Sequence, residues 1–180
     1  MGPTISHKAP IGEQNVDANS FQSLIAQLTG EIAGAPLDAA LEAHLNANHG
    51  PGSYLYDAIS DACNSGVKDG WMCNREAGGL RYGRVLKPTD ATHGFSVDVV
   101  DMKDLAGPHH VHPNGEIDLI MPLTEGARFD GCPAGWCVYE AGSGHRPTVA
   151  GGRALVLYLL PQGAIDFSAA APSTPSATSA

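Results

Sequence analysis

Four short runs of β-forming residues occupy the second half of the chain, at residues 80–86, 95–100, 116–122 and 154–160. Glycine, proline, asparagine and aspartate are frequent between these runs, and no helical pattern separates them. Successive strands joined by turn residues pair as an antiparallel sandwich or barrel. The last run is apolar at every position, which is typical of a strand buried on both faces. The sequence therefore predicts a mainly β fold.

The first third of the chain has a helical period instead. Apolar residues recur three and four positions apart within residues 20–30, 36–48 and 54–66, which predicts three helices. Ser20 is the expected N-cap of the first helix, and Gly30 is its expected end. These segments predict an N-terminal helical segment beside the β fold.

A chain of 180 residues suits one domain with a substantial core. We expect residues 1–75 to form an N-terminal arm and a helical segment packed on a barrel, and residues 76–167 to form that barrel. Residues 168–180 consist of alanine, serine, threonine and proline, a composition typical of a disordered tail.

The formal net charge is −9 with only 10 lysines and arginines, so no basic patch is available for nucleic acid or an anionic membrane. No run approaches the ~20 apolar residues of a spanning helix, and no secretory signal pattern opens the chain. These features predict a cytoplasmic protein without a nucleic-acid or membrane partner. In that compartment Cys63, Cys73, Cys132 and Cys137 are expected as reduced thiols, and the absence of a C-x-x-C pair disfavours a zinc site.

The segment Gly-Pro-His-His-Val-His-Pro-Asn-Gly-Glu-Ile-Asp, residues 107–118, has the composition of a metal site. His110 and His112 are two positions apart, so in a strand both point to the same face. The Pro-Asn-Gly turn then allows Glu116 to return to the same point, and a Gly-rich turn leads to His145 as a fourth ligand. Imidazole and carboxylate ligands suit a divalent first-row metal such as Fe, Mn, Zn or Ni.

The neighbouring His109 alternates to the other face of the same strand. It is therefore expected outside the ligand set, although a register shift of one residue would exchange it for His110. A lone histidine near a turn is ordinarily a polar surface or core residue. Three histidines and a glutamate in this order favour the metal site instead.

Two segments resemble the motifs of the cupin superfamily. Residues 107–126 resemble the first cupin motif, with Gly126 slightly late. Residues 142–149 resemble the second motif in His145, but they lack the proline-x-glycine that usually precedes it. The resemblance implies a cupin-type (jelly-roll) β-barrel that binds one metal through three histidines and one glutamate, with one or two coordination positions left open.

A closer resemblance covers most of the chain. The helical segment, the Leu-Arg-Tyr-Gly-Arg-Val-Leu-Lys-Pro run at residues 80–88, the metal-ligand segment and the His-Arg-Pro-Thr-Val run at residues 145–149 are together similar to the 4-hydroxylaminobenzoate lyases. This resemblance implies the conversion of 4-hydroxylaminobenzoate to protocatechuate with release of ammonia, in bacterial breakdown of nitroaromatic compounds such as 4-nitrobenzoate.

The small aromatic acid that the resemblance implies as substrate needs a cation for its carboxylate and apolar walls for its ring. Arg81 and Arg84 are the leading candidates for the carboxylate, but they differ in strand parity, so only one faces the barrel. Arg146, beside His145, is a further candidate. The candidate ring-stacking residues are Tyr82, Trp136 and Tyr139.

The implied reaction needs no external oxidant, because the N–O bond is itself the oxidant. A Lewis-acidic metal would promote N–O cleavage. Water would then add to the ring, and an imine would hydrolyse to release ammonia. A general acid–base group would assist, and the candidates from the sequence are His109, Asp118 and Glu140.

Other functions remain open at this point. A cupin dioxygenase acting on an aromatic acid would share the ligands but consume dioxygen. A non-catalytic ligand-binding cupin often accompanies a DNA-binding helical unit, for which the N-terminal segment is too poor in lysine and arginine. A sugar-phosphate isomerase would need more basic residues. Long apolar strands and the cupin resemblance favour a homodimer or a larger homo-oligomer.

Overall fold

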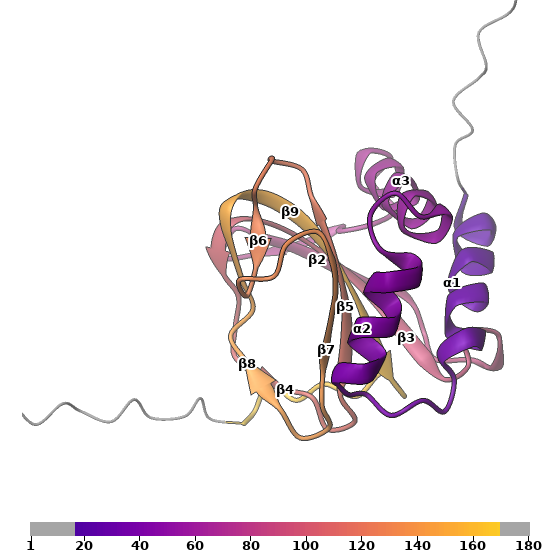
Figure 1. The fold of residues 1–180 in the computed structure, drawn as a ribbon. Coiled ribbons are helices and arrows are strands. Elements are labelled where there is room, and N and C mark those ends of the chain that lie inside the picture. The colour runs from indigo at the N-terminus through magenta and orange to yellow at the C-terminus, as the bar shows by residue number, and fades with distance from the viewer. Residues whose placement is uncertain (1–16, 170–180) are drawn as a thin grey trace, which may run out of the picture.

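In the computed structural model, which describes residues 17–169, three helices pack against one side of a curved antiparallel sheet (Figure 1). The helices are α1 (Ala18–Ile32), α2 (Ala39–His49) and α3 (Tyr54–Lys68), with a short 3-10 helix η1 (Asp90–Thr92). The strands are β1 (Arg75–Ala77), β2 (Leu80–Leu86), β3 (Phe95–Ala106), β4 (His110–Val111), β5 (Glu116–Pro122), β6 (Arg128–Phe129), β7 (Gly135–Tyr139), β8 (Gly144–His145) and β9 (Thr148–Pro161). The predicted fold class, a mainly β barrel with an N-terminal helical segment, is confirmed.

The long central strand β9 organises the sheet. The strand order is β1-β2-β3-β9-β5-β7, with β6 also paired to β9, and every pair is antiparallel. A separate two-stranded sheet, β4-β8, closes the barrel on the side away from the helices (Figure 1). The sheet therefore has an outer face under the helices and an inner face toward β4 and β8.

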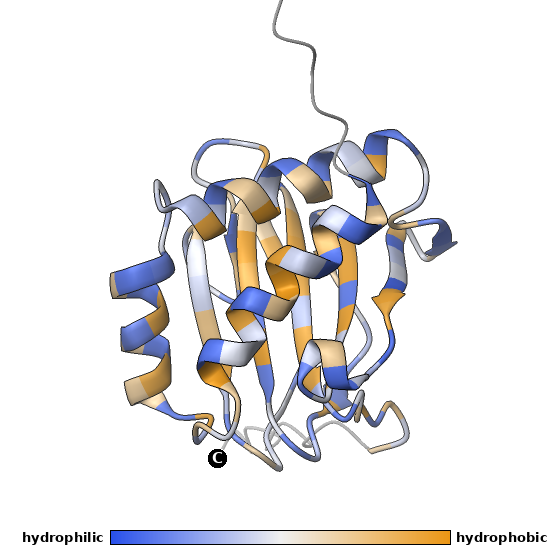
Figure 2. Cartoon of the chain, turned by 90° about the vertical axis from the view of Figure 1, so that its right-hand side faces the viewer, coloured by the Kyte–Doolittle hydropathy of each residue, from blue (hydrophilic) through white to orange (hydrophobic). Residues whose placement is uncertain are grey.

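Alternation along β9 divides the core in two. Leu155, Leu157 and Leu159 pack with residues of the helices, whereas Val156 and Tyr158 belong to a second cluster inside the barrel. Figure 2 shows the helices crossing in front of the hydrophobic strands that they cover. The prediction of a strand buried on both faces is therefore confirmed for β9. Its two apolar rows bury area on two separate cores, which stabilises the sheet from both sides.

The structure corrects several predicted boundaries. The first helix begins after Asp17 rather than Ser20, because the Asp17 carboxylate accepts a hydrogen bond from the Ser20 N–H at 2.8 Å and caps the helix. It also continues past Gly30 to Ile32, whose side chain is buried in the core. Strand β9 begins earlier than expected because its first residues pair with β6 and with the end of β3.

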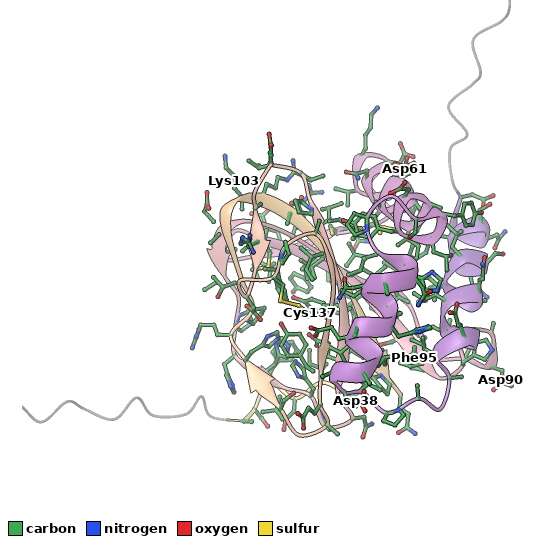
Figure 3. All side chains as sticks on the ribbon, viewed as in Figure 1. Asp38, Asp61, Asp90, Phe95, Lys103 and Cys137 are labelled. Carbon is green, nitrogen blue, oxygen red and sulfur yellow. A yellow bond between two sulfur atoms is a disulfide. The ribbon has the colours of Figure 1, made fainter. Side chains whose placement is uncertain are left out.

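The cysteines divide into two pairs. Cys63 and Cys73 are free and buried, as expected of reduced thiols, but Cys132 and Cys137 form a disulfide. The expectation of four reduced thiols is thus wrong for this pair. An isolated antiparallel β-bridge pairs the backbones of Phe129 and Cys132 and turns the chain back toward β7. There Cys137 points into the barrel (Figure 3).

The predicted N-terminal arm at residues 1–16 and most of the predicted tail, residues 170–180, lie outside the described residues. Ser168 and Ala169, at the start of that tail, are described. None of the helices within residues 17–169 is long and apolar enough to cross a membrane.

Candidate metal centre and its cavity

The pairing of β4 with β8 brings the predicted metal ligands together. His110 lies directly opposite His145 in this pair, His112 follows two positions later, and Glu116 is the first residue of β5. One ligand atom from each of the four side chains lies within 4.8 Å of the others. The group is therefore able to hold a metal ion.

A tight turn returns the chain from His112 to Glu116. The Gly115 N–H donates to the His112 carbonyl at 3.2 Å, and Gly115 has a φ of 87°. A Cβ atom at this position would lie 2.6 Å from Cδ2 of Leu37 and 2.8 Å from the carbonyl oxygen of Tyr139. Only glycine fits both this backbone conformation and this contact, so the turn in the sequence determines where the carboxylate arrives.

The spacing of the four side chains fits one ion at their centre. Nε2 of His110 and Nε2 of His145 are 3.0 Å apart. Glu116 oxygens lie 3.4 Å from Nε2 of His110, 3.2 Å from Nε2 of His112 and 3.5 Å from Nε2 of His145. Ligands bound at ~2.1 Å around one metal are separated by roughly these distances.

Burial supports the same conclusion. His110, His112 and Glu116 are fully buried, yet within residues 17–169 neither oxygen of Glu116 nor Nε2 of His112 has a hydrogen-bond partner. Buried polar atoms left without a partner cost free energy, and a shared cation would satisfy these atoms together. The residues present therefore fit a divalent metal with a set of three nitrogens and one carboxylate.

Two further residues orient the imidazoles. Ser143 Oγ donates to the Glu140 carbonyl at 2.6 Å and therefore accepts from Nδ1–H of His112 at 3.0 Å. Nδ1–H of His145 donates to Asp130 at 2.5 Å. Both hydrogen bonds leave Nε2 of the ring free to bind a metal.

Asp130 is held in place by two further donors. Its carboxylate accepts from the hydroxyl of Tyr139 and from the N–H of Thr148, each at 2.9 Å. The ring of Tyr139 also packs beside His145, with ring centroids 4.7 Å apart. Tyr139 therefore lies at the ligand group, on its Asp130 side.

The electrostatics of the group follow from burial and from the close carboxylates. Burial raises the pKa of Glu116, but the three close imidazoles of His110, His112 and His145 outweigh it and hold that pKa well below its ordinary value. Burial and the neighbouring Glu116 raise the pKa of Asp118 well above the ordinary value of a carboxyl. In the metal-free protein the charge therefore favours Glu116 and the proton favours Asp118.

The protonation of His145 leads to a prediction: metal binding should release a measurable proton. Burial lowers the pKa of His145, but the hydrogen bond with Asp130 and the close Glu116 carboxylate raise it to about 9 in the metal-free protein. The protonated ring stabilises the metal-free fold below about pH 6.5, and this contribution is lost as the pH rises through the folded-state pKa. Because a metal requires the free Nε2 lone pair, we expect Mn²⁺ binding at pH 7.5 to release about one proton from His145.

This release is measured by titrating metal-free protein with Mn²⁺ in a pH-stat. The Asp130→Asn variant is the matched control, since it removes the carboxylate that raises the pKa of His145, and it should release less. A Mn²⁺ affinity that does not change between pH 7 and pH 9 would contradict the assignment.

A cavity of about 720 Å³ adjoins the ligand group, with His110 in its wall. Tyr82 and Arg84 enter it from β2 and Tyr158 from β9, and Arg75 and Lys87 complete its cationic lining. The cavity therefore combines aromatic surface with positive charge beside the candidate metal.

Arg84 is the arginine of β2 that faces this cavity. It pairs with Asp98 across the sheet, donating from Nε at 2.9 Å and from Nη2 at 3.1 Å. Nη2 also donates to the Gly163 carbonyl at 3.3 Å, while Nη1 donates to no residue within the described chain. One end of the guanidinium is therefore fixed, and Nη1 remains available.

Three of the proposed substrate residues lie elsewhere. Arg81 faces the outer side of the sheet, where it pairs with Asp101 at 3.4 Å. Trp136 packs in the core under the helices, and its indole N–H donates to the His49 carbonyl at 2.7 Å. Arg146 is exposed and does not line the cavity. Strand parity thus points the side chains of Arg81 and Trp136 to the outer face of the sheet, away from the cavity.

The three acid–base candidates lie in three different environments. Glu140 is exposed to solvent. His109 is half-buried outside the ligand group, and its Nδ1–H donates to the Ala169 carbonyl at 3.3 Å. Asp118 alone is fully buried inside the barrel, close to Glu116. His110, rather than His109, is the residue that joins the ligand group.

Several residues of the site were not among those predicted from the sequence. Ser143 lies in the Gly-rich turn before His145, where a hydroxyl could have been anticipated. Asp130 and Tyr158 approach from strands or turns distant in sequence, and Phe167 follows the last strand. Only the folded chain brings these side chains to the histidines.

A second group of potential ligands lies at the surface between α1 and α2. Glu31 oxygens are 3.3 Å from Nε2 of His44 and 2.8 Å from Nε2 of His49. Asn48 donates to Nδ1 of His44 at 3.2 Å, which leaves Nε2–H of that ring to donate to Glu31. These side chains satisfy one another, and we assign the group to the packing of the two helices.

Comparison of the sequence with known proteins identifies one family. The model of the 4-hydroxylaminobenzoate lyase family matches residues 23–167. A 4-hydroxylaminobenzoate lyase from Nocardioides sp. (strain LMS-CY) is 37% identical over 142 residues, covering 74% of this chain and 84% of that protein. A 4-hydroxylaminobenzoate lyase from Pseudomonas putida is 35% identical over 147 residues, covering 72% and 84%.

Similar solved structures are more distant. An RmlC-like cupin protein from Ralstonia eutropha has a TM-score of 0.35 and 13% identity, covering 47% of this chain and 57% of that chain. The DMSP lyase DddQ from Ruegeria pomeroyi has a TM-score of 0.37 and 18% identity, covering 82% and 95%.

Proposed function

Because the chain belongs to the 4-hydroxylaminobenzoate lyase family, we propose that it converts 4-hydroxylaminobenzoate to protocatechuate and ammonia in a metal-dependent reaction. The observation that carries this proposal is the buried group His110, His112, Glu116 and His145 at the wall of a cationic, aromatic cavity. A reaction of this kind serves the bacterial breakdown of nitroaromatic acids such as 4-nitrobenzoate.

The cavity suits an aromatic acid whose carboxylate lies near Arg84 and whose hydroxylamino group lies near His110. Arg84, with its free Nη1, and the nearby Arg75 and Lys87 provide positive charge for the carboxylate. His110 lies in the wall of the same cavity, so the hydroxylamino group at the opposite end of the ring would meet the ligand group. Tyr82 and Tyr158 offer aromatic surface to the ring between these ends.

The reaction balances without an oxidant. The N–O bond breaks and its hydroxyl leaves as water, one water adds to the ring carbon beside the nitrogen, and a second water hydrolyses the resulting imine. Loss of ammonia and return of aromaticity give the catechol, so the net change consumes one water. A divalent metal held by the four ligands would supply Lewis acidity toward the N–O bond.

The chain's own residues supply the proton transfer. Asp118 is the candidate proton donor, because it is buried inside the barrel beside Glu116 and its raised pKa keeps the proton on its carboxyl. Tyr139 and Asp130 keep His145 in the tautomer that presents Nε2 to the ligand group. The hydroxyl lost from nitrogen needs a proton, and Asp118 is a fully buried carboxyl beside Glu116 of the ligand group.

An anaerobic assay tests this function directly. Purified protein, analysed for its metal content, is mixed with 4-hydroxylaminobenzoate without dioxygen, and ammonia and protocatechuate are measured. We expect both products in equal amounts. A requirement for dioxygen would instead support an aromatic dioxygenase, and the absence of any product would refute the lyase reaction.

Arg84 gives a prediction for substrate selection. In the double variant Arg84→Gln with Asp98→Asn, which avoids leaving a half-buried carboxylate unpaired, kcat/KM for 4-hydroxylaminobenzoate should fall by ~10- to 100-fold. The same variant should treat hydroxylaminobenzene, which lacks the carboxylate, like the unmodified protein. An equal loss with both compounds would mean that Arg84 does not contact the carboxylate.

A further inference from the structure

A short segment after β9 crosses back to the ligand strand β4. Asp166 pairs with Val111, with the Val111 N–H donating to the Asp166 carbonyl at 2.8 Å and the Asp166 N–H donating to the Val111 carbonyl at 2.9 Å. Three residues further along, the Ala169 carbonyl accepts from His109 at 3.3 Å. We call residues 165–169 the C-terminal strap. It is attached to the two residues that flank His110.

These attachments hold Phe167 against the ligand group. Its ring lies edge-on to His110, with ring centroids 5.3 Å apart and an interplanar angle of 63°. Ser168 reinforces the bend, because its N–H and its hydroxyl both donate to the Asp166 carboxylate, at 2.8 Å and 2.6 Å. The position of Phe167 is therefore fixed by hydrogen bonds on both sides of it.

Phe167 is unusually exposed for a side chain so well positioned. Within residues 17–169 the exposed large apolar side chains are Tyr54, Leu123 and Phe167, and Phe167 is 57% exposed. Of these three, only Phe167 lines the cavity that contains His110 and Arg84. An aromatic face left open to a cavity gains free energy when another apolar surface covers it and removes it from water.

We propose that Phe167, positioned by the C-terminal strap, packs on the aromatic ring of the substrate and selects for aromatic acids. This inference rests on the proposed function and adds the residue that recognises the ring. The ring would lie between Phe167, Tyr82 and Tyr158, with its carboxylate toward Arg84. His109 is then a positioning residue, because it holds the strap rather than touching the substrate.

Binding of a compound that cannot react tests the inference. Calorimetry with the metal-loaded protein compares 4-aminobenzoate with trans-4-hydroxycyclohexanecarboxylate, which also carries one carboxylate and one neutral hydrogen-bonding group but has no aromatic ring. Phe167→Ala should weaken binding of 4-aminobenzoate by about 10-fold and leave binding of the cyclohexane compound nearly unchanged. Phe167→Tyr should retain the preference for the aromatic compound. Because the side chain is exposed, metal content and melting temperature should not change.

Tyr54→Ala is the matched control, since it removes an exposed aromatic side chain that does not line the cavity. Unchanged affinity of Phe167→Ala for 4-aminobenzoate would overturn the inference, as would a failure of the unmodified protein to bind either compound. The two hypotheses fail separately. Loss of aromatic preference in Phe167→Ala without any lyase turnover in the unmodified protein would refute only the proposed reaction.

Discussion

His110→Ala is expected to purify without bound metal and to lose turnover by about 10³-fold or more. The variant keeps only two imidazoles and one carboxylate, and it removes the ring that lies 3.0 Å from His145 and in the cavity wall. A bound metal that supplies Lewis acidity contributes several kcal/mol to the reaction, which corresponds to a loss of this size. Elemental analysis and the ammonia assay measure the two effects.

His44→Ala is the control for this experiment. It also removes a histidine, but one that lies at the surface beside Glu31. Its metal content should equal that of the unmodified protein. If His110→Ala still bound one metal per chain and turned over normally, the buried group would not be the metal centre.

Asp118→Asn is expected to lower kcat by ~10²- to 10⁴-fold while the metal content is retained. Asparagine has nearly the same shape as the acid but cannot release a proton. Asp118 is fully buried, and its neighbour Glu116 raises its pKa, so the acid form is the one available to the reaction. Steady-state kinetics and metal analysis on the same preparation distinguish the loss of a proton donor from the loss of bound metal.

Glu140→Gln is the matched control, because it neutralises an exposed carboxylate on the neighbouring turn and should leave kcat unchanged. If Asp118 only oriented Glu116, the metal affinity of Asp118→Asn would fall instead, and excess metal would restore kcat. Full kcat without added metal would exclude both roles.

Local patterns in the sequence were sufficient to predict several strands and most of the candidate ligand group. The bounds of β2 and β5 match the predicted runs, since each run is short, rich in β-formers and closed by turn residues. The spacing of His110, His112 and Glu116 was sufficient to predict that these side chains converge. Alternation in a strand places the two histidines on one face, and Gly115 returns the chain to the same point.

Choices between equivalent residues required the tertiary structure. The sequence could show that Arg81 and Arg84 face opposite ways, but only the packing of the helices on one face of the sheet decided that Arg84 enters the cavity and Arg81 lies beside α3. Trp136 was a reasonable ring-stacking candidate by residue type. Its strand lies under α2, and parity turns the indole toward that helix rather than into the barrel.

Contacts between distant segments had no local signal at all. Asp130 orients His145 across 15 positions, and Phe167 reaches His110 only because the C-terminal strap pairs with β4. The disulfide between Cys132 and Cys137 likewise depends on a turn that periodicity does not reveal. By itself, the sequence predicted the three helices, four of the strands and the convergence of His110, His112 and Glu116, because these follow from spacing within short segments. The tertiary structure decided which side chains surround the ligands, because that depends on how the sheet curls and which strands become neighbours.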